Sequence, residues 1–156
     1  MKRLTIDDNY IVSVRSNFDG TLVFNKGGYN ERWYSIGDAA EMPWEELKDI
    51  RKYNRNFFEN NWIMVESDDE YKASQFYEAL GVSQYYPDAD QFKDVDAVLS
   101  MKPKEMTTYL KDKSQEYRDT LYTYAKRLIE EEDPRMDSNA KRTTLEKILG
   151  VSFDEV

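Results

Sequence analysis

Residues 10–34 read YIVSVRSNFDGTLVFNKGGYNERWY and have the pattern of β-strands joined by turns. It contains three runs rich in β-branched and aromatic residues, which are separated by turns at Asp19-Gly20 and Gly27-Gly28. β-Branched and aromatic side chains favour strands, and glycine readily adopts the positive φ angles that tight hairpins require. The stretch therefore predicts a three-stranded antiparallel meander.

The next segment predicts one helix and one more strand. Pro43 suits the start of a helix, Glu45 and Glu46 are favoured in its first turn, and apolar residues recur at helical spacing as far as residue 60. Residues 61–66 then predict a strand that closes the sheet. We expect residues 1–66 to form a small antiparallel sheet, or an SH3-like barrel, with one helix.

Residues 67–156 predict a bundle of short helices. Ser67 and Glu70 have the spacing of a capping box at the start of the first helix, which Gly81 ends. Asp90 is placed to cap a second, short helix. Further starts are predicted at Pro103, at Ser114, and at Asp137 or Ser138, with ends at Pro134 and Gly150. The expected class is therefore α+β, with domains at residues 1–66 and 67–156.

Composition excludes most familiar enzyme chemistry. The chain has 156 residues and contains neither histidine nor cysteine. It cannot supply a histidine base, a catalytic thiol, a thiolate or imidazole metal site, or a disulfide. We expect a protein that is not an enzyme, with no catalytic residues, no cofactor and no metal.

Targeting signals are also lacking in the sequence. The apolar run at residues 62–65 is far shorter than the roughly 20 residues that span a bilayer. Within residues 1–10, Asp7 and Asp8 occur before any apolar core that a secretory signal would need. We expect no membrane partner and a location inside the cell.

The net charge of −9 is uneven along the sequence, with −2 in residues 1–66 and −7 in residues 67–156. Nucleic-acid affinity comes largely from clustered lysine and arginine, so we expect no direct nucleic-acid partner. The same charge raises an alternative function. An acidic helical surface would mimic nucleic acid and block a host or defence DNA-binding protein, provided that its carboxylates align on one exposed face.

Residues 88–96 (DADQFKDVD) form the densest carboxylate cluster. A calcium loop beginning at Asp88 would need an oxygen ligand at position five, glycine at six and glutamate at twelve. Those positions hold Phe92, Lys93 and Leu99. We interpret the cluster as a solvated acidic turn with a helix cap.

Other catalytic patterns are incomplete. Glu70-Tyr71-Lys72 has one half of a metal-dependent nuclease pattern but precedes Pro87-Asp88, which reverses the required order. The sequence contains neither of the glycine-rich nucleotide-binding motifs, G-x-x-x-x-G-K-(S/T) and G-x-G-x-x-G. Gly27-Gly28 also has no helix directly behind it. A hydrolase that uses two carboxylates stays open as a third option, since such a pair needs only a spatial separation.

The third predicted strand carries the candidate interaction site. Most aromatic residues have the spacing of core positions. An edge strand at residues 29–34 would instead expose its aromatics and anchor a protein partner. We therefore predict a protein interface at Tyr29, Arg32, Trp33 and Tyr34.

Arginines stand out in the same region. Arg15, Arg32, Arg51 and Arg55 are interpreted mainly as partners of nearby acids within the molecule. The partners we expect are Asp49, Glu59 and Glu31. A small basic contact patch is the alternative.

Several short segments resemble a pattern found in small proteins of tailed bacteriophages. They are VRSNFDGTLVF (14–24), ERW (31–33), MPWEEL (42–47), IR (50–51), RNFF (55–58), NW (61–62), ALG (79–81), YY (85–86) and LEKILG (145–150). The resemblance implies a non-enzymatic structural part of the capsid, neck or tail, present in the virion and, during assembly, in the host cytoplasm. Such a protein docks on larger virion proteins in multiple copies of a symmetric assembly.

Overall fold

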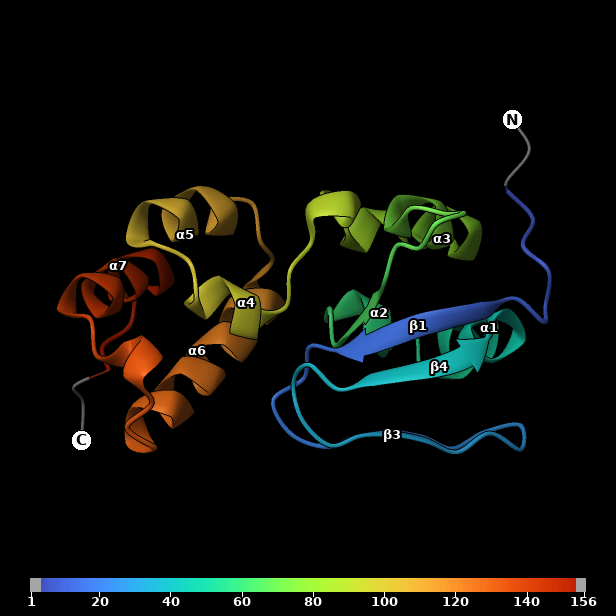
Figure 1. Ribbon diagram of the computed structural model, residues 1–156, viewed down its shortest axis with the longest axis horizontal. Helices are drawn as coiled ribbons and strands as arrows, with labels where there is room; N and C mark the ends of the chain where they lie inside the picture. The colour runs from blue at the N-terminus through green and yellow to red at the C-terminus, as the bar shows by residue number, and fades with distance from the viewer. Residues whose placement is uncertain (1–3, 154–156) are drawn as a thin grey trace. The chain divides into compact units, whose positions relative to one another are not determined.

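The computed structural model describes residues 4–153, which divide into two compact units (Figure 1). Unit 1 extends to Asp94 and unit 2 begins at Val95. An antiparallel sheet in unit 1 is followed by a series of helices, which confirms the α+β class. The unit boundary lies well beyond Ser67, where the sequence pattern changes from strand to helix.

The sheet of unit 1 is built around β1 (Ile11–Ser16). This strand pairs antiparallel with β4 (Ala39–Pro43) on one side and with β5 (Ile63–Val65) on the other. β2 (Leu22–Phe24) and β3 (Glu31–Trp33) form a separate two-stranded hairpin.

The predicted meander is therefore wrong in its pairing, since β1 does not pair with β2. The chain beyond β1 keeps bonding to the neighbours of β1. The Ser16 amide donates to the Asp38 carbonyl, and the Asn17 amide donates to the Trp62 carbonyl. These bonds carry the chain past the point at which a tight β1–β2 turn would begin.

The helix predicted for residues 43–60 is two helices. α1 (Trp44–Tyr53) begins directly after Pro43, as predicted, and α2 (Asn56–Glu59) follows. Asn54 separates them because its backbone, at φ −135° and ψ 53°, leaves the helical region.

The core of unit 1 includes the first helix after Ser67. Val12 and Val14 of β1 alternate with more exposed residues and face a buried cluster. α3 (Ala73–Leu80) adds the buried side chains of Phe76 and Tyr77 to this same cluster. Short 3₁₀ turns η1 (Ser83–Tyr85) and η2 (Ala89–Gln91) follow α3. Shared burial thus explains why unit 1 continues to Asp94.

α3 starts later than the sequence indicated. The prediction of a capping box at Ser67 and Glu70 is wrong. Asp68 instead accepts the amides of Glu70 and Tyr71 in a turn. Ser67 still contributes, since its hydroxyl accepts the Ala73 amide at 2.8 Å. The predicted end is confirmed: Gly81 caps α3 at φ 75°, where glycine has no steric penalty.

Unit 2 is helical. It consists of α4 (Val95–Leu99), α5 (Pro103–Leu110), α6 (Gln115–Glu130), η3 (Pro134–Met136) and α7 (Asn139–Leu149). The predicted starts are confirmed, since Ser114 and Ser138 accept amides through their hydroxyls and Pro103 is the first residue of α5. Gly150 ends α7 at φ 67°. No helix among residues 4–153 has the length and apolar composition to cross a membrane.

Basic side chains of unit 2 bond to helix ends. Arg118 donates to the carbonyls of Leu110 and Ile148, near the C-termini of α5 and α7. The Lys141 ammonium donates to the Leu99 carbonyl at the end of α4. Positive groups are favourable at these positions because a helix C-terminus carries partial negative charge.

Candidate functional site

Three exposed side chains gather on the hairpin β2–β3. Val23 lies opposite Arg32 in the strand register, and Tyr34 follows two positions later. Tyr34 is 67% exposed and Val23 is 39% exposed, while Arg32 is also exposed. Val23, Arg32 and Tyr34 are called the hairpin surface below.

Two of the predicted interface residues face inward instead. Trp33 is fully buried, and its indole N–H donates to the Val14 carbonyl at 3.0 Å. Tyr29 is half-buried and packs against the core of unit 1. Of the four predicted residues, Arg32 and Tyr34 therefore remain as candidate contacts. Side-chain alternation along a strand held the missing signal, because Trp33 points away from the face that carries Arg32 and Tyr34.

Most arginines of unit 1 are used within the fold. Arg15 pairs with Glu66 and also donates to the Gly37 carbonyl. Arg51 and Arg55 donate to the carbonyls of Leu80 and Gly81 at the end of α3. The predicted pairing with Asp49, Glu59 and Glu31 is wrong: among these three arginines Arg15 pairs with a different acid, Glu66, and Arg51 and Arg55 bond to carbonyls instead of acids.

Arg32 differs from these three arginines. Within residues 4–153 it forms no hydrogen bond or ion pair. Arginine and tyrosine are enriched among the residues that dominate protein–protein binding energy. The hairpin surface therefore combines an unengaged cation, an exposed aromatic ring and an aliphatic neighbour.

The outer edge of β5 is covered by two tyrosines. The Tyr86 hydroxyl donates to the Ile63 carbonyl at 2.6 Å, and the Val65 amide donates to the Tyr77 hydroxyl at 2.9 Å. The two rings stack with centroids 3.9 Å apart. This tyrosine pair satisfies the backbone groups that would otherwise recruit another strand at this edge.

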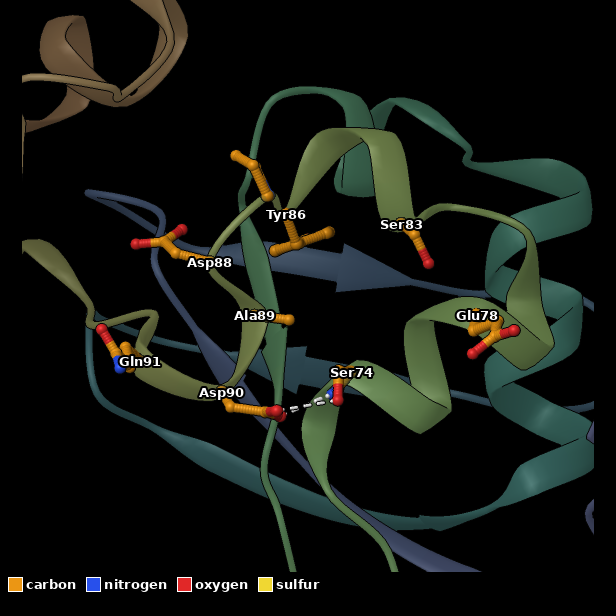
Figure 2. Close-up of a pocket in the computed structure, with 9 residues that line it drawn as sticks. Ser74, Glu78, Ser83, Tyr86, Asp88, Ala89, Asp90 and Gln91 are labelled. Atoms are coloured by element: carbon orange, nitrogen blue, oxygen red, sulfur yellow. Dashed lines mark hydrogen bonds between the residues drawn. The ribbon is translucent and has the colours of Figure 1, made fainter.

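An open pocket of about 470 Å³ lies between α3 and η2 (Figure 2). Its lining includes the carboxylates of Glu78, Asp88 and Asp90. Asp90 accepts the Ser74 amide at 3.0 Å and the Ser74 hydroxyl at 2.9 Å. Both hydrogen bonds lower the pKa of Asp90, and the bond from the Ser74 amide has the larger effect. Asp90 therefore serves as a cap of α3.

This arrangement corrects the role predicted for Asp90. We expected it to cap the helix that follows, but it caps the helix that precedes it, 16 residues away from Ser74. The capped amide is only one residue inside the start of α3, where amides have no partner within the helix.

The acidic cluster of residues 88–96 is split between the two units. Asp88, Asp90 and Asp94 belong to unit 1, whereas Asp96 belongs to unit 2. There Asp96 accepts hydrogen bonds from Tyr124 and Arg135. Burial opposes ionisation of Asp96, but these bonds outweigh it and lower its pKa. Within the described residues, no group of three or more acidic side chains is arranged to hold a metal ion.

The charge is distributed differently when it is counted for the two structural units. Residues 1–94 contain 18 acidic and 11 basic residues, a net charge of −7, whereas residues 95–156 contain 13 and 11, a net charge of −2. Residues 67–94 alone hold seven acidic and two basic residues. The negative excess predicted for the helical part therefore lies mainly in residues 67–94, in the turns before and after α3.

No family model, curated protein or solved structure matches this chain.

Proposed function

We propose that this chain is a non-enzymatic structural or assembly protein of a tailed-bacteriophage virion. It docks on a larger capsid, neck or tail protein through the hairpin surface. The observation that carries this docking surface is the contrast between Arg32 and the other arginines of unit 1 that the structure describes: these three are bonded internally, and Arg32 is presented beside the exposed Tyr34.

Binding energetics support this choice of surface. A partner that covers Tyr34 removes a large aromatic ring from water, and its acidic groups or carbonyls can accept hydrogen bonds from the Arg32 guanidinium. Val23 adds aliphatic area beside them. The phage assignment rests on the resemblance of the short sequence segments, and a virion component is expected in a copy number set by particle symmetry.

Quantitative mass spectrometry of purified particles tests the proposal. We expect the protein in particles of the phage that encodes it, at a fixed number of copies per particle. Its presence in the infected lysate together with its absence from particles would refute the virion assignment.

A matched pair of double variants tests the surface. Arg32→Ala with Tyr34→Ala is expected to lower the copy number at least tenfold. The control, Lys52→Ala with Tyr53→Ala, removes an exposed cation and an exposed tyrosine from α1 and should leave the copy number unchanged. Equal incorporation of both double variants would exclude the hairpin surface while leaving the virion assignment intact.

A second function is favoured by one specific observation. Glu78, Asp88 and Asp90 line one open pocket within the acidic stretch of residues 67–94. An inhibitor that mimics nucleic acid would present such carboxylates to the basic cleft of a host or defence DNA-binding protein. The affinity of such an inhibitor for its target should fall steeply between about 50 and 300 mM salt, because salt screens the attraction between exposed charges. Salt-independent binding, or none at low salt, would count against it.

A further inference from the structure

The turn that follows β3 holds the backbone of Tyr34 while leaving its ring exposed. Tyr34 is 67% exposed, so a partner can reach most of the side chain. The Tyr34 amide donates to Oδ2 of Asp38 at 2.8 Å, and the Ser35 amide donates to the same oxygen at 3.2 Å. One carboxylate oxygen therefore accepts both amides at the base of the exposed ring.

Asp38 is itself fixed by backbone hydrogen bonds. Its amide donates to the Ser35 carbonyl at 3.1 Å, and its carbonyl accepts the Ser16 amide at 2.8 Å. Ser16 is the last residue of β1 and is fully buried, and β4 begins directly after Asp38. The Asp38 side chain therefore connects the Tyr34 backbone to the central strand of the sheet.

Gly37 adds a second attachment to the same strand. Its amide donates to the Ser16 carbonyl at 3.0 Å, and its carbonyl accepts a hydrogen bond from the Arg15 guanidinium at 2.9 Å. Arg15 is held in turn by its ion pair with Glu66, which follows β5. Gly37 and Asp38 are thus bonded to β1, and the Asp38 carboxylate extends this support to Tyr34 and Ser35.

This support affects how strongly Tyr34 can bind. Ordering a mobile contact residue opposes association, because the residue loses conformational entropy when the partner binds. A contact residue whose backbone is already fixed in the free protein avoids that part of the loss. A carboxylate that fixes the Tyr34 backbone therefore strengthens docking through Tyr34.

We propose that Asp38 is a positioning residue of the hairpin surface. Its carboxylate fixes the backbone of Tyr34 in the free protein, so the ring is presented to the docking partner in an ordered position. The inference rests on the proposed docking function and adds to it a residue that acts through Tyr34.

Incorporation of tagged variants into phage particles, in competition with the wild type, tests the proposal. Asp38→Ala removes the acceptor of both amides and should lower the incorporated share roughly fivefold, in line with the loss of hydrogen bonds to a charged group. Asp38→Asn retains a side-chain oxygen that can accept the same amides, so its share should stay within about twofold of the wild type.

Asp7→Ala is the matched control. Oδ1 of Asp7 accepts the Asn9 amide at 2.8 Å, so this variant removes a bond of the same kind outside the hairpin. It should be incorporated like the wild type. An equal fall for Asp7→Ala and Asp38→Ala would overturn the positioning role.

A double variant separates positioning of Tyr34 from a general loss of stability. If Asp38 acts through Tyr34, Asp38→Ala combined with Tyr34→Ala should be incorporated as well as Tyr34→Ala alone. A further fall in the double variant, or wild-type incorporation of Asp38→Ala when Tyr34→Ala is impaired, would overturn the positioning role and leave the hairpin surface as the docking site. Wild-type incorporation of Tyr34→Ala would refute that surface, and the positioning role with it.

A measurement on the free wild-type protein keeps the test valid if Asp38→Ala does not fold. Nitrogen-15 relaxation should give amide order parameters for Tyr34 and Ser35 near the value of about 0.85 that is typical of rigid backbone. Values below about 0.6 would show that the turn is mobile in the free protein and would overturn the proposal.

Discussion

Replacement of Tyr86 by phenylalanine probes the tyrosine pair that covers β5. The substitution retains the ring and therefore its stacking on Tyr77, so it removes only the hydroxyl. That hydroxyl donates to the Ile63 carbonyl at 2.6 Å and also meets the side chain of Asn61. Tyr86 is only 2% exposed, so water has little access to replace the lost bonds.

The expected destabilisation is about 2 kcal/mol, because a buried acceptor deprived of its donor typically costs ~1–3 kcal/mol. Urea unfolding monitored by tryptophan emission measures this loss in the appropriate unit, since Trp33, Trp44 and Trp62 all belong to unit 1. With a denaturant slope of about 1.5 kcal/mol per molar, the midpoint should fall by more than about 1 M.

Tyr53→Phe is the matched control for this measurement. Tyr53 is 51% exposed on α1, so the loss of its hydroxyl should leave the midpoint unchanged. Equal midpoints for Tyr86→Phe and Tyr53→Phe would refute the argument that the hydroxyl stabilises the edge of β5. Increased aggregation of Tyr86→Phe at native conditions would further indicate that this edge has become available for strand pairing.

Three further substitutions test other contacts. Asp90→Ala should destabilise unit 1 by about 1 kcal/mol through loss of the cap on α3, seen as faster amide exchange at Ser74. Because the pKa of Asp90 is lowered in the fold, the stability that the cap contributes should be lost as the pH falls below the usual carboxyl value of 3.8, and a pH-independent contribution would contradict the cap. Trp33→Phe should cost about 2 kcal/mol by removing the bond to the Val14 carbonyl and leaving a void, and an unchanged urea midpoint would argue against this role. Ser138→Ala should cost about 1 kcal/mol in unit 2, measured by circular dichroism during thermal unfolding, and a wild-type melting temperature would exclude the cap.

Helix boundaries were predictable because their causes are local. Pro103, Ser114, Ser138 and Gly150 each act on amides or carbonyls a few residues away, so the short motif contains the whole interaction. These four boundaries are confirmed by the structure.

Strand pairing was not predictable in the same way. β4 contains two alanines and a glutamate, which have low strand propensity, and its hydrogen bonds to β1 depend on residues far apart in the chain. The cap that Asp90 provides to α3 has the same character, because Ser74 and Asp90 are 16 residues apart in the chain. Patterns among neighbouring residues therefore do not predict these interactions.

The candidate sites show both cases. Exposure of Arg32 and Tyr34 follows from strand alternation, and so does the opposite orientation of Trp33. The burial of Glu46 had a weaker signal: it lies four residues before the buried Ile50 and so shares a face of α1 with it. The charge of Glu31, which helps to raise the pKa of Glu46, comes from a hairpin distant in sequence, and no local pattern specifies that proximity.

The bonding of Arg51, Arg118 and Lys141 to helix ends has a consequence for how copies of the chain associate. These cations lie at carbonyls rather than beside acidic side chains, and the net charge of −9 already counts them in full, so the whole negative excess acts on any approaching copy. Two copies that approach each other therefore experience like-charge repulsion that dissolved salt reduces. A ring of such copies would need either screening ions or a positively charged scaffold between them, so self-association should rise with ionic strength.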